Sequence, residues 1–321
     1  MSRWVSLCVG VVMLAGCASG PLPWGGAHQL QELQADLAQI AKDAESPSPS
    51  GYVIKVHVQG EEVFSRHEGL ASAEMGESIH DETVFELASL SKIFTALAVM
   101  QLHEQGRLAL DQPLGLYLSD LPETWAKLNT HQLLSHQSGL PDLLNLWPRK
   151  RLDGLDFGSV LAHFRKSPAL LYIPGTQAAY SNTNYMLLAH LVSQVSGLDF
   201  GEYLQQHVFE PAGMASSSVL DALPRWVGQQ ALPEAREGKV HGIDYALIGA
   251  ISQKSSMRDL ENFMQALWQN KLMKSKTLDL MMRPHAEFAD GKRYGYGWYI
   301  GRLGGWAGLS SNLPAQAVGH T

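Results

Sequence analysis

The chain is poor in cysteine and in charged residues. Its 321 residues include only 2 cysteines, Cys8 and Cys17, and 17% of the residues are charged. Acidic side chains outnumber basic ones by 31 to 24, which gives a formal net charge of −7. A nucleic-acid-binding surface usually needs a basic surplus, so the charge balance argues against that class of partner. The 45% of hydrophobic residues is typical of a globular protein with a sizeable core.

Several motifs of common enzyme classes are also missing. The chain has neither the Gly-x-Ser-x-Gly of α/β-hydrolases nor the His-Glu-x-x-His of zinc peptidases. Gly295, Gly297 and Gly301 are spaced one residue too far apart for a dinucleotide-binding loop, and no helical pattern follows them. His131 and His136 lie five apart in a predicted loop, where capping or packing is expected instead of ligation. We therefore expect no metal and no cofactor.

The N-terminus has the features of a secretory signal. Arg3 precedes an apolar stretch, 4–15, that is too short to span a bilayer. The sequence Leu-Ala-Gly-Cys at 14–17 resembles the bacterial lipobox, in which the signal is removed before an acylated cysteine; the alternative is a plain secretory signal that happens to contain Cys17. We expect a signal peptide at 1–16 and membrane attachment through lipid on Cys17. Ala18 after the cysteine favours the outer membrane of a bacterial envelope, facing the periplasm.

The remaining sequence predicts an α+β domain. Residues 17–50 contain a Gly- and Pro-rich tether and then Leu30, Leu33, Leu37 and Ile40 at helical spacing. An alternating run at 54–58 predicts a strand, and helical patterns cover 89–105, 184–196 and 257–270. Strand-like composition returns at 294–300 and 317–320. This order predicts one antiparallel sheet formed by both chain ends and a helical lobe between them, over residues 51–321.

Ser89 and Lys92 are spaced for chemistry on one helix. Three residues apart, their side chains lie on the same face, one turn from each other. The helix N-terminus offers free N–H groups to an oxyanion, and a lysine in a dry site can lose its proton and act as a base. By itself, however, a Ser-x-x-Lys motif is expected about once by chance in a chain of this length, as an ordinary surface feature.

Two further groups gain meaning from their order along the chain. Tyr180-Ser181-Asn182 follows a Pro-Gly pair and precedes a predicted helix, and His320-Thr321 ends a predicted strand. A tyrosine beside a lysine can be pushed toward the phenolate, and an asparagine offers a donor and an acceptor to an amide. Taken singly, the first group is typical of a helix cap and the second has no meaning.

Together the three motifs resemble those of the penicillin-recognising serine hydrolases, in the branch with class C β-lactamases, D-alanyl-D-alanine peptidases and related esterases. The segments 83–88, 133–141 and 294–298 agree with this resemblance. It implies a β-lactamase-like fold and an acyl-enzyme on Ser89, with Lys92 and Tyr180 moving protons. It further implies that Asn182 and His320 bind substrate. The expected substrate is a small molecule or a peptidoglycan-derived peptide with an amide or ester bond: a β-lactam, a D-alanyl peptide or a small ester.

The sequence departs from this family at its end. Family members continue after the third motif with a glycine, further strands and a C-terminal helix, whereas this sequence stops at Thr321. The resemblance places one oxyanion donor beyond that glycine, so we expect a fragment, or a truncated product with little activity. The rival hypothesis is a lipid-anchored, non-catalytic module that binds envelope components on the same fold.

Overall fold

The computed structural model describes residues 10–14, 31, 34–39, 51–58, 61–72, 75–146, 157–166, 168–219, 247–302 and 316–319. Its strands are β1 (Gly10–Leu14), β2 (Tyr52–Val58), β3 (Glu61–Glu68), β4 (Leu70–Ser72), β5 (Glu77–Ser78), β6 (Val84–Glu86), β7 (Ser218–Val219), β8 (Gln253–Ser256), β9 (Ala286–Glu287), β10 (Arg293–Tyr294), β11 (Tyr299–Arg302) and β12 (Gln316–Gly319). The longer helices are α2 (Ser91–Glu104), α6 (Phe157–Phe164), α7 (Asn182–Ser196), α11 (Met257–Trp268) and α12 (Ser275–Met281).

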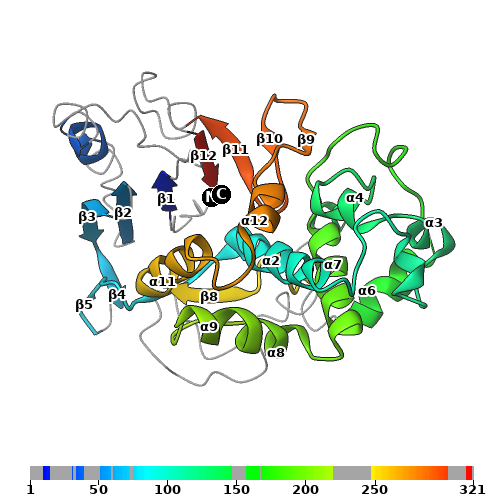
Figure 1. Cartoon of the computed structure of the whole chain (residues 1–321), viewed down its shortest axis with the longest axis horizontal. Helices are drawn as coiled ribbons and strands as arrows, with labels where there is room; N and C mark the ends of the chain where they lie inside the picture. The colour runs from blue at the N-terminus through cyan, green and yellow to red at the C-terminus, as the bar shows by residue number, and fades with distance from the viewer. Residues whose placement is uncertain are drawn as a thin grey trace.

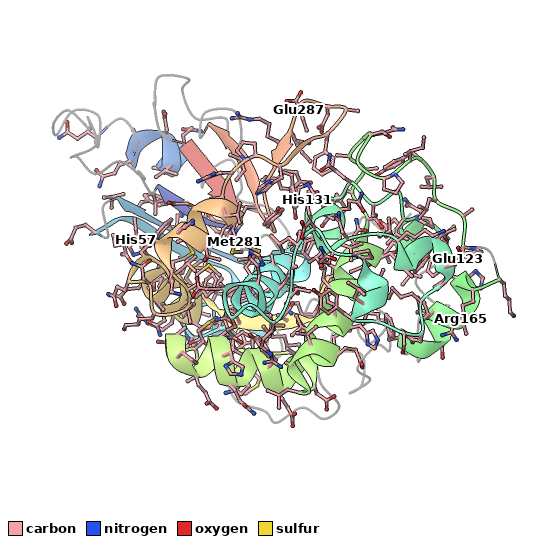
Figure 2. All side chains as sticks on the ribbon, turned by 45° about the vertical axis from the view of Figure 1, so that its right-hand side comes forward. His57, Glu123, His131, Arg165, Met281 and Glu287 are labelled. Carbon is pink, nitrogen blue, oxygen red and sulfur yellow. The ribbon has the colours of Figure 1, made fainter. Side chains whose placement is uncertain are left out.

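The shorter helices include a 3-10 turn η1 (Ala88–Leu90), η2 (Leu114–Leu116), α3 (Glu123–Ala126), α4 (Thr130–Leu134), α5 (Leu143–Leu146), α8 (Phe200–Leu204), the π-helical η4 (Gln205–Phe209) and α9 (Glu210–Ala212). The sheet of β1, β2 and β3 lies at one end of the molecule and helices α3, α4 and α6 lie at the other, with α2 between them (Figure 1). His57 and Glu123 mark these opposite ends in Figure 2. The expected α+β class is therefore confirmed.

The sheets bring the two ends of the described chain together. β2 and β3 form an antiparallel hairpin with an irregularity at Val56 and His57, and β1 runs parallel to β2. β9, β10, β11 and β12 form a four-stranded antiparallel sheet. β1 also lies against β12, so it stands between the two sheets in Figure 1. The strand at 10–14 falls in the segment expected to be a signal peptide, and the removal of that segment stays a prediction.

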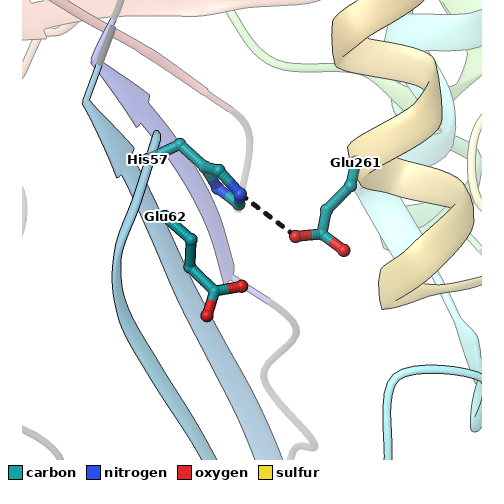
Figure 3. A group of neighbouring side chains, drawn as sticks. All are labelled: His57, Glu62 and Glu261. Carbon is teal, nitrogen blue, oxygen red and sulfur yellow. Dashed lines mark ion pairs between the residues drawn. The ribbon is translucent and has the colours of Figure 1, made fainter. Parts of the chain in front are cut away.

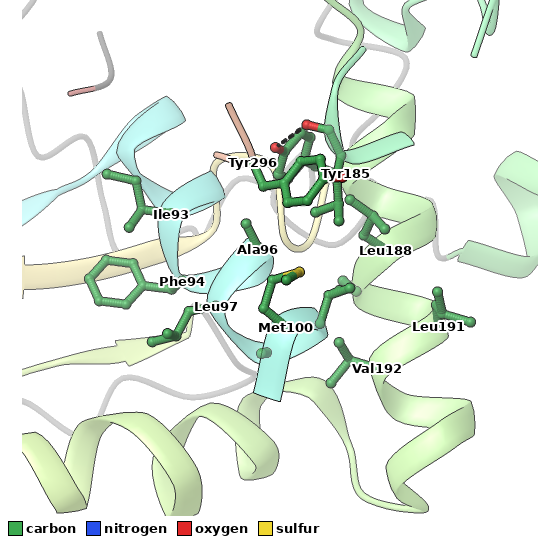
Figure 4. Packing of buried hydrophobic residues seen from close by; sticks show 14 of the residues in the cluster. Ile93, Phe94, Ala96, Leu97, Met100, Tyr185, Leu188, Leu191, Val192 and Tyr296 are labelled. Carbon is green, nitrogen blue, oxygen red and sulfur yellow. Dashed lines mark hydrogen bonds between the residues drawn. The ribbon is translucent and has the colours of Figure 1, made fainter. Parts of the chain in front are cut away.

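Helix α2 forms the centre of the core. Twelve consecutive residues, from Ser91 to Leu102, are buried, which is the pattern of a helix enclosed on every side. Phe94 packs against the rings of Phe209 and Phe263, at centroid distances of 5.8 and 4.6 Å. On another side Met100 lies near Val192 of α7 (Figure 4). The nucleophile candidate Ser89 thus stands just before the most deeply buried helix.

The helix boundaries follow local sequence signals. The expected helix 89–105 begins as η1 and continues as α2, after which Gly106 adopts a φ of 71°. α7 starts two residues earlier than expected and ends, as expected, at Gly197, whose φ is 78°. The Ser256 side chain accepts a hydrogen bond from the Asp259 amide and caps α11. Residues 34–39 are helical, as the leucine spacing predicts. Among the described residues, none of the helices has the length and apolar character needed to cross a membrane.

Candidate active site

Ser89 lies in a short turn that aims its hydroxyl at two other side chains. It belongs to η1 and is partly exposed, and the preceding residue, Ala88, has a φ of 45°, which is unfavourable for a residue with a Cβ. The Tyr180 hydroxyl donates to the Ser89 Oγ over 3.0 Å, and the Lys92 Nζ lies 3.2 Å from the same atom. Three residues predicted from two separate motifs therefore meet at one oxygen.

Lys92 is a fully buried amine with defined partners. Its Nζ lies 2.8 Å from Asn182 Oδ1 and 2.9 Å from the Ala250 carbonyl oxygen, besides its contact with Ser89. Burial lowers the pKa of Lys92 to about 7, although the charge of Asp142 acts in the opposite direction. A neutral amine has two N–H bonds and one lone pair. Donation to Asn182 and to Ala250 leaves the lone pair directed at the Ser89 hydroxyl, as a general base requires.

The protonation state of Tyr180 differs from the expectation that a nearby cation would favour the phenolate. Its ring centroid lies 4.9 Å from Lys92 Nζ, but burial raises the pKa of Tyr180 far above its ordinary value, despite the hydrogen bond with Ser89. The burial cost of a phenolate exceeds the attraction of an amine that itself titrates near neutrality. Tyr180 is therefore a proton donor in this arrangement. The ring of His136 lies against it, with centroids 4.5 Å apart.

Asn182 is the first residue of α7, and its amide is held at both ends. Oδ1 accepts from Lys92, while Nδ2 lies 3.2 and 3.1 Å from the two carboxylate oxygens of Asp142. Neither Asp142 nor the Ala250 carbonyl belongs to a motif that the sequence reveals. The available signal for Asp142 was its place directly after the segment 133–141, whereas a backbone carbonyl such as that of Ala250 leaves no mark in a sequence.

Ala250 reaches Lys92 because its loop passes close to two helices. Gly249 has a φ of 81°, and a Cβ there would lie 2.6 Å from the Ala189 Cβ and 2.7 Å from the Tyr185 carbonyl oxygen. The Thr95 hydroxyl donates to the Gly249 carbonyl over 2.7 Å. Glycine is required at this point because only a residue without a side chain fits both the backbone angle and the space.

The histidines flagged in the sequence have packing roles within the described residues. His131 Nδ1 lies 2.7 Å from the Tyr296 hydroxyl, and the His136 Nδ1 accepts from the Ser181 amide and from Asn184 Nδ2, at 3.2 and 3.1 Å. His136 thereby orders the segment that carries Tyr180. Two other predicted residues, His320 and Cys17, lie outside the described residues, although β12 ends directly before His320.

One group in the described chain has the composition of a metal site. His57, Glu62 and Glu261 place a ring nitrogen and two carboxylate oxygens within 4.8 Å of one another (Figure 3). However, the Lys55 Nζ lies 3.0 Å from Glu62, 3.2 Å from Glu261 and 2.7 Å from Asp81. This ammonium already pairs with both carboxylates of the group. The group is therefore an ion network that joins the β2–β3 hairpin to α11. No pattern in the sequence predicts this network.

Comparisons with known proteins identify the family of the chain. The family described as Beta-lactamase matches residues 38–321. Penicillin-binding protein 4* of Bacillus subtilis (strain 168) is 28% identical over 286 residues, which cover 77% of this chain and 61% of that protein. Esterase EstB of Burkholderia gladioli is 30% identical over 190 residues, which cover 54% and 48%. The chain spans 61%, 54% and 40% of the length of three such curated relatives.

Solved structures show the same fold. A penicillin-binding protein from Bacillus halodurans superposes with a TM-score of 0.65 at 27% identity and covers 82% of each chain. A D-amino acid amidase from Ochrobactrum anthropi SV3 superposes with a TM-score of 0.70 at 23% identity, over 90% of this chain and 84% of that one; at this identity the likeness concerns the fold alone. By its family match and its fold, the chain belongs to the β-lactamase family.

Proposed function

We propose that the protein is a serine hydrolase that cleaves amide or ester bonds through an acyl-enzyme on Ser89. The observation that supports this best is the position of the Ser89 Oγ, which lies 3.2 Å from the Lys92 amine and 3.0 Å from the Tyr180 hydroxyl. A serine hydroxyl is a weak nucleophile unless a base removes its proton. A lysine with a pKa of about 7 supplies that base near neutral pH.

The proposed reaction has two stages. In the first, Lys92 accepts the Ser89 proton while Oγ attacks the substrate carbonyl, and the Tyr180 hydroxyl then protonates the leaving amine or alkoxide. The Lys92 ammonium then returns its proton to the Tyr180 phenolate, whose ring centroid lies 4.9 Å from Nζ. In the second stage water attacks the acyl group, its proton passes to Lys92, and Lys92 gives a proton to the Ser89 Oγ as the ester bond breaks.

We propose a substrate class from the chemistry of the relatives. Their printed descriptions include a putative D-alanyl-D-alanine carboxypeptidase from Escherichia coli O157:H7, a D-aminopeptidase from Brucella anthropi and an esterase. We infer that this protein acts on a small molecule or a peptidoglycan-derived peptide, with β-lactams, D-alanyl peptides and small esters as the candidates. Hydrolysis of one member of each class, measured on the same preparation, separates them.

Covalent labelling tests the proposed activity. A fluorescent β-lactam and a fluorophosphonate should each label the wild-type protein, and mass spectrometry should place the adduct on the Ser89 peptide. Ser89→Ala should abolish the label, while Ser275→Ala, at an exposed serine of α12, should keep it. An equal label on Ser89→Ala would refute the assignment. A wild-type protein that no probe labels, but that binds peptidoglycan, would support the non-catalytic binding module instead.

We also propose that the mature protein is anchored in a bacterial envelope by lipid on Cys17, at the outer membrane and facing the periplasm. Support comes from the sequence Leu-Ala-Gly-Cys at 14–17 and from Ala18 behind it. Cells that express the protein should incorporate radiolabelled palmitate into it, and Cys17→Ser should abolish that incorporation. Cys8→Ser is the matched control and should keep it. Equal incorporation in both variants would contradict the anchor.

A further inference from the structure

The orientation of the Asn182 amide depends on two groups of opposite character. A lysine amine faces one end and a carboxylate faces the other, at distances of 2.8 Å from Oδ1 and 3.1 to 3.2 Å from Nδ2. A carboxylate can only accept hydrogen bonds, so it selects the NH2 end of the amide. Rotating the amide by half a turn would set oxygen against carboxylate and N–H against N–H. Asp142 therefore keeps Oδ1 directed at Lys92.

The Asp142 carboxylate is itself firmly placed. Its Oδ1 accepts from the backbone amides of Leu144 and Asn182, at 3.2 and 3.3 Å. The preceding carbonyl, of Pro141, accepts from the Thr183 hydroxyl at 2.7 Å, and the following amide, of Leu143, donates to the same hydroxyl at 3.0 Å. These bonds clamp the loop onto the first turn of α7, where the helix dipole favours a negative charge.

The charge of Asp142 also acts on Lys92. Burial lowers the pKa of Lys92 and Asp142 raises it. Among the described residues, the other groups that face Lys92 are uncharged near neutral pH: Ser89 from η1, the Ala250 carbonyl from its loop, and the rings of Tyr180 and Tyr185 at 4.9 and 5.7 Å. Burial raises the pKa of both tyrosines well above the ordinary value. Asp142 is thus the source of charge to which the Lys92 amine responds.

We propose that Asp142 is a positioning residue for acylation of Ser89: it fixes the orientation of the Asn182 amide and thereby holds the Lys92 amine against the nucleophile. This inference rests on the proposed hydrolase function and assigns to it a residue outside the three motifs. Asp142 touches neither Ser89 nor the acyl group in this scheme, and it acts through Asn182.

Two substitutions separate the charge from the hydrogen bond. Asp142→Asn keeps an oxygen that can accept from Asn182 Nδ2 but removes the charge. Its acylation rate should therefore reach a plateau within about threefold of the wild type, while the midpoint of the pH–rate curve moves down by about half a unit to one unit. Asp142→Ala also removes the acceptor, so the Asn182 amide can rotate. The plateau of the acylation rate of this variant should therefore fall a further tenfold or more. Asp111→Asn, at an exposed aspartate, is the control and should change neither quantity.

A double-mutant cycle tests whether Asp142 acts through Asn182. In an Asn182→Ala background, Asp142→Ala should lower the plateau rate by less than about twofold, because the amide that it orients is gone. Acylation is followed by stopped flow with a chromogenic ester from pH 5 to 9, and thermal unfolding shows that each variant is folded. If Asp142→Ala does not fold, Asp142→Leu takes its place in the cycle, because leucine fills a similar volume and offers no acceptor to Asn182 Nδ2.

The outcomes distinguish this inference from the function on which it rests. If Ser89 is not acylated in the wild type, the proposed function fails. If the wild type is acylated but both Asp142 variants keep its pH midpoint and plateau, only the positioning role is overturned. Equal rate losses for Asp142→Ala with and without Asn182 would likewise overturn it, because the loss would then not pass through the amide.

Discussion

Tyr180 and Ser89 are separated by 91 residues in the sequence, yet the tyrosine hydroxyl donates to the serine Oγ over 3.0 Å. The contact joins the segment before α7 to the turn before α2, so it exists only when these two helices pack together. Lys92 approaches the same oxygen from within α2. The candidate site is therefore a property of the helix pair.

The first prediction concerns the pH dependence of acylation. Because burial holds the pKa of Lys92 at about 7, the neutral amine forms as the pH rises through this value. The rate of acylation should increase tenfold per pH unit well below pH 7 and level off above it. Stopped-flow acylation with a chromogenic ester measures the curve. A rate that is flat from pH 5 to 8 would show that Lys92 is not the base.

A second prediction links Lys92 to stability. Below pH 7 the folded chain must hold a buried ammonium, and this destabilisation disappears as the pH rises toward the pKa of the unfolded chain, near 10.5. Lys92→Met removes the effect. The free energy of unfolding of the variant, relative to wild type, should therefore decrease by roughly 1 kcal/mol per pH unit between pH 7.5 and 9.5.

Urea denaturation at several pH values gives this difference. Lys271→Met, at an exposed lysine, serves as the control and should show no such trend. A difference for Lys92→Met that stays constant with pH would mean that the folded chain tolerates the ammonium at this position.

Tyr180→Phe tests the proton donor. Because burial raises the pKa of Tyr180, the phenol keeps its proton at every pH at which the enzyme would work. Removing the hydroxyl should slow acylation by about 100- to 10,000-fold and leave the midpoint near pH 7 in place. Single-turnover rates across pH provide the measurement. A wild-type rate that rises a second time between pH 8 and 9, and a variant rate that does not, would identify a phenolate base instead.

Gly249→Ala tests the loop that presents the Ala250 carbonyl. Gly291 is a matched control, because its φ of 79° is close to the 81° of Gly249 but a Cβ there meets nothing within 4 Å. Gly291→Ala should cost about 1 kcal/mol of stability from the backbone angle. Gly249→Ala should cost about 3 kcal/mol or more, because the Cβ collides with α7, and it should also slow acylation. Equal costs at the two positions would show that the loop moves away freely.

The ion network around Lys55 should stabilise the β2–β3 hairpin against α11. Lys55 is only 5% exposed, and Lys55→Met removes the buried cation that Asp81 and Glu261 share, which leaves them the half-exposed Arg258. We expect a loss of about 2 to 4 kcal/mol by urea denaturation. Lys127→Met removes an exposed pair with Glu123 and should change stability by less than about 0.5 kcal/mol. Similar losses for both variants would refute the network's structural role.

The pH dependence of this network has a defined sign. Burial raises the pKa of Asp81, but hydrogen bonds with Lys55 and His67 outweigh it and hold the pKa below the ordinary value. Its stabilisation is present above pH 4 and should be lost as the pH falls through the lowered pKa of the folded state. Asp81→Asn should therefore be less stable than wild type at pH 7, and the two should converge toward pH 2.

The sequence was sufficient to predict features whose signal lies within a short segment. Periodicity and terminal glycines located α2, α7 and α11, and the spacing of Ser89 and Lys92 placed both on one helix face. The resemblance to a family supplied Tyr180 and Asn182, which the structure brings to the same site. The roles of Asp142 and the Ala250 carbonyl could not be predicted from the sequence, because they depend on contacts with residues 40 and 158 positions away. The direction of the Tyr180 pKa also required the structure, since it depends on burial.

Because α2 is buried on every side, the parts of the site should unfold in a definite order. Amide protons in this helix have no surface route for exchange, so they should exchange with deuterium only when the whole molecule opens. The turn that holds Ser89 is continuous with the helix, whereas Tyr180 belongs to a partly exposed segment. Partial opening of the molecule would therefore separate Tyr180 from Ser89 while Lys92 still contacts Ser89. The site would lose its proton donor while the nucleophile and its base still stood in place.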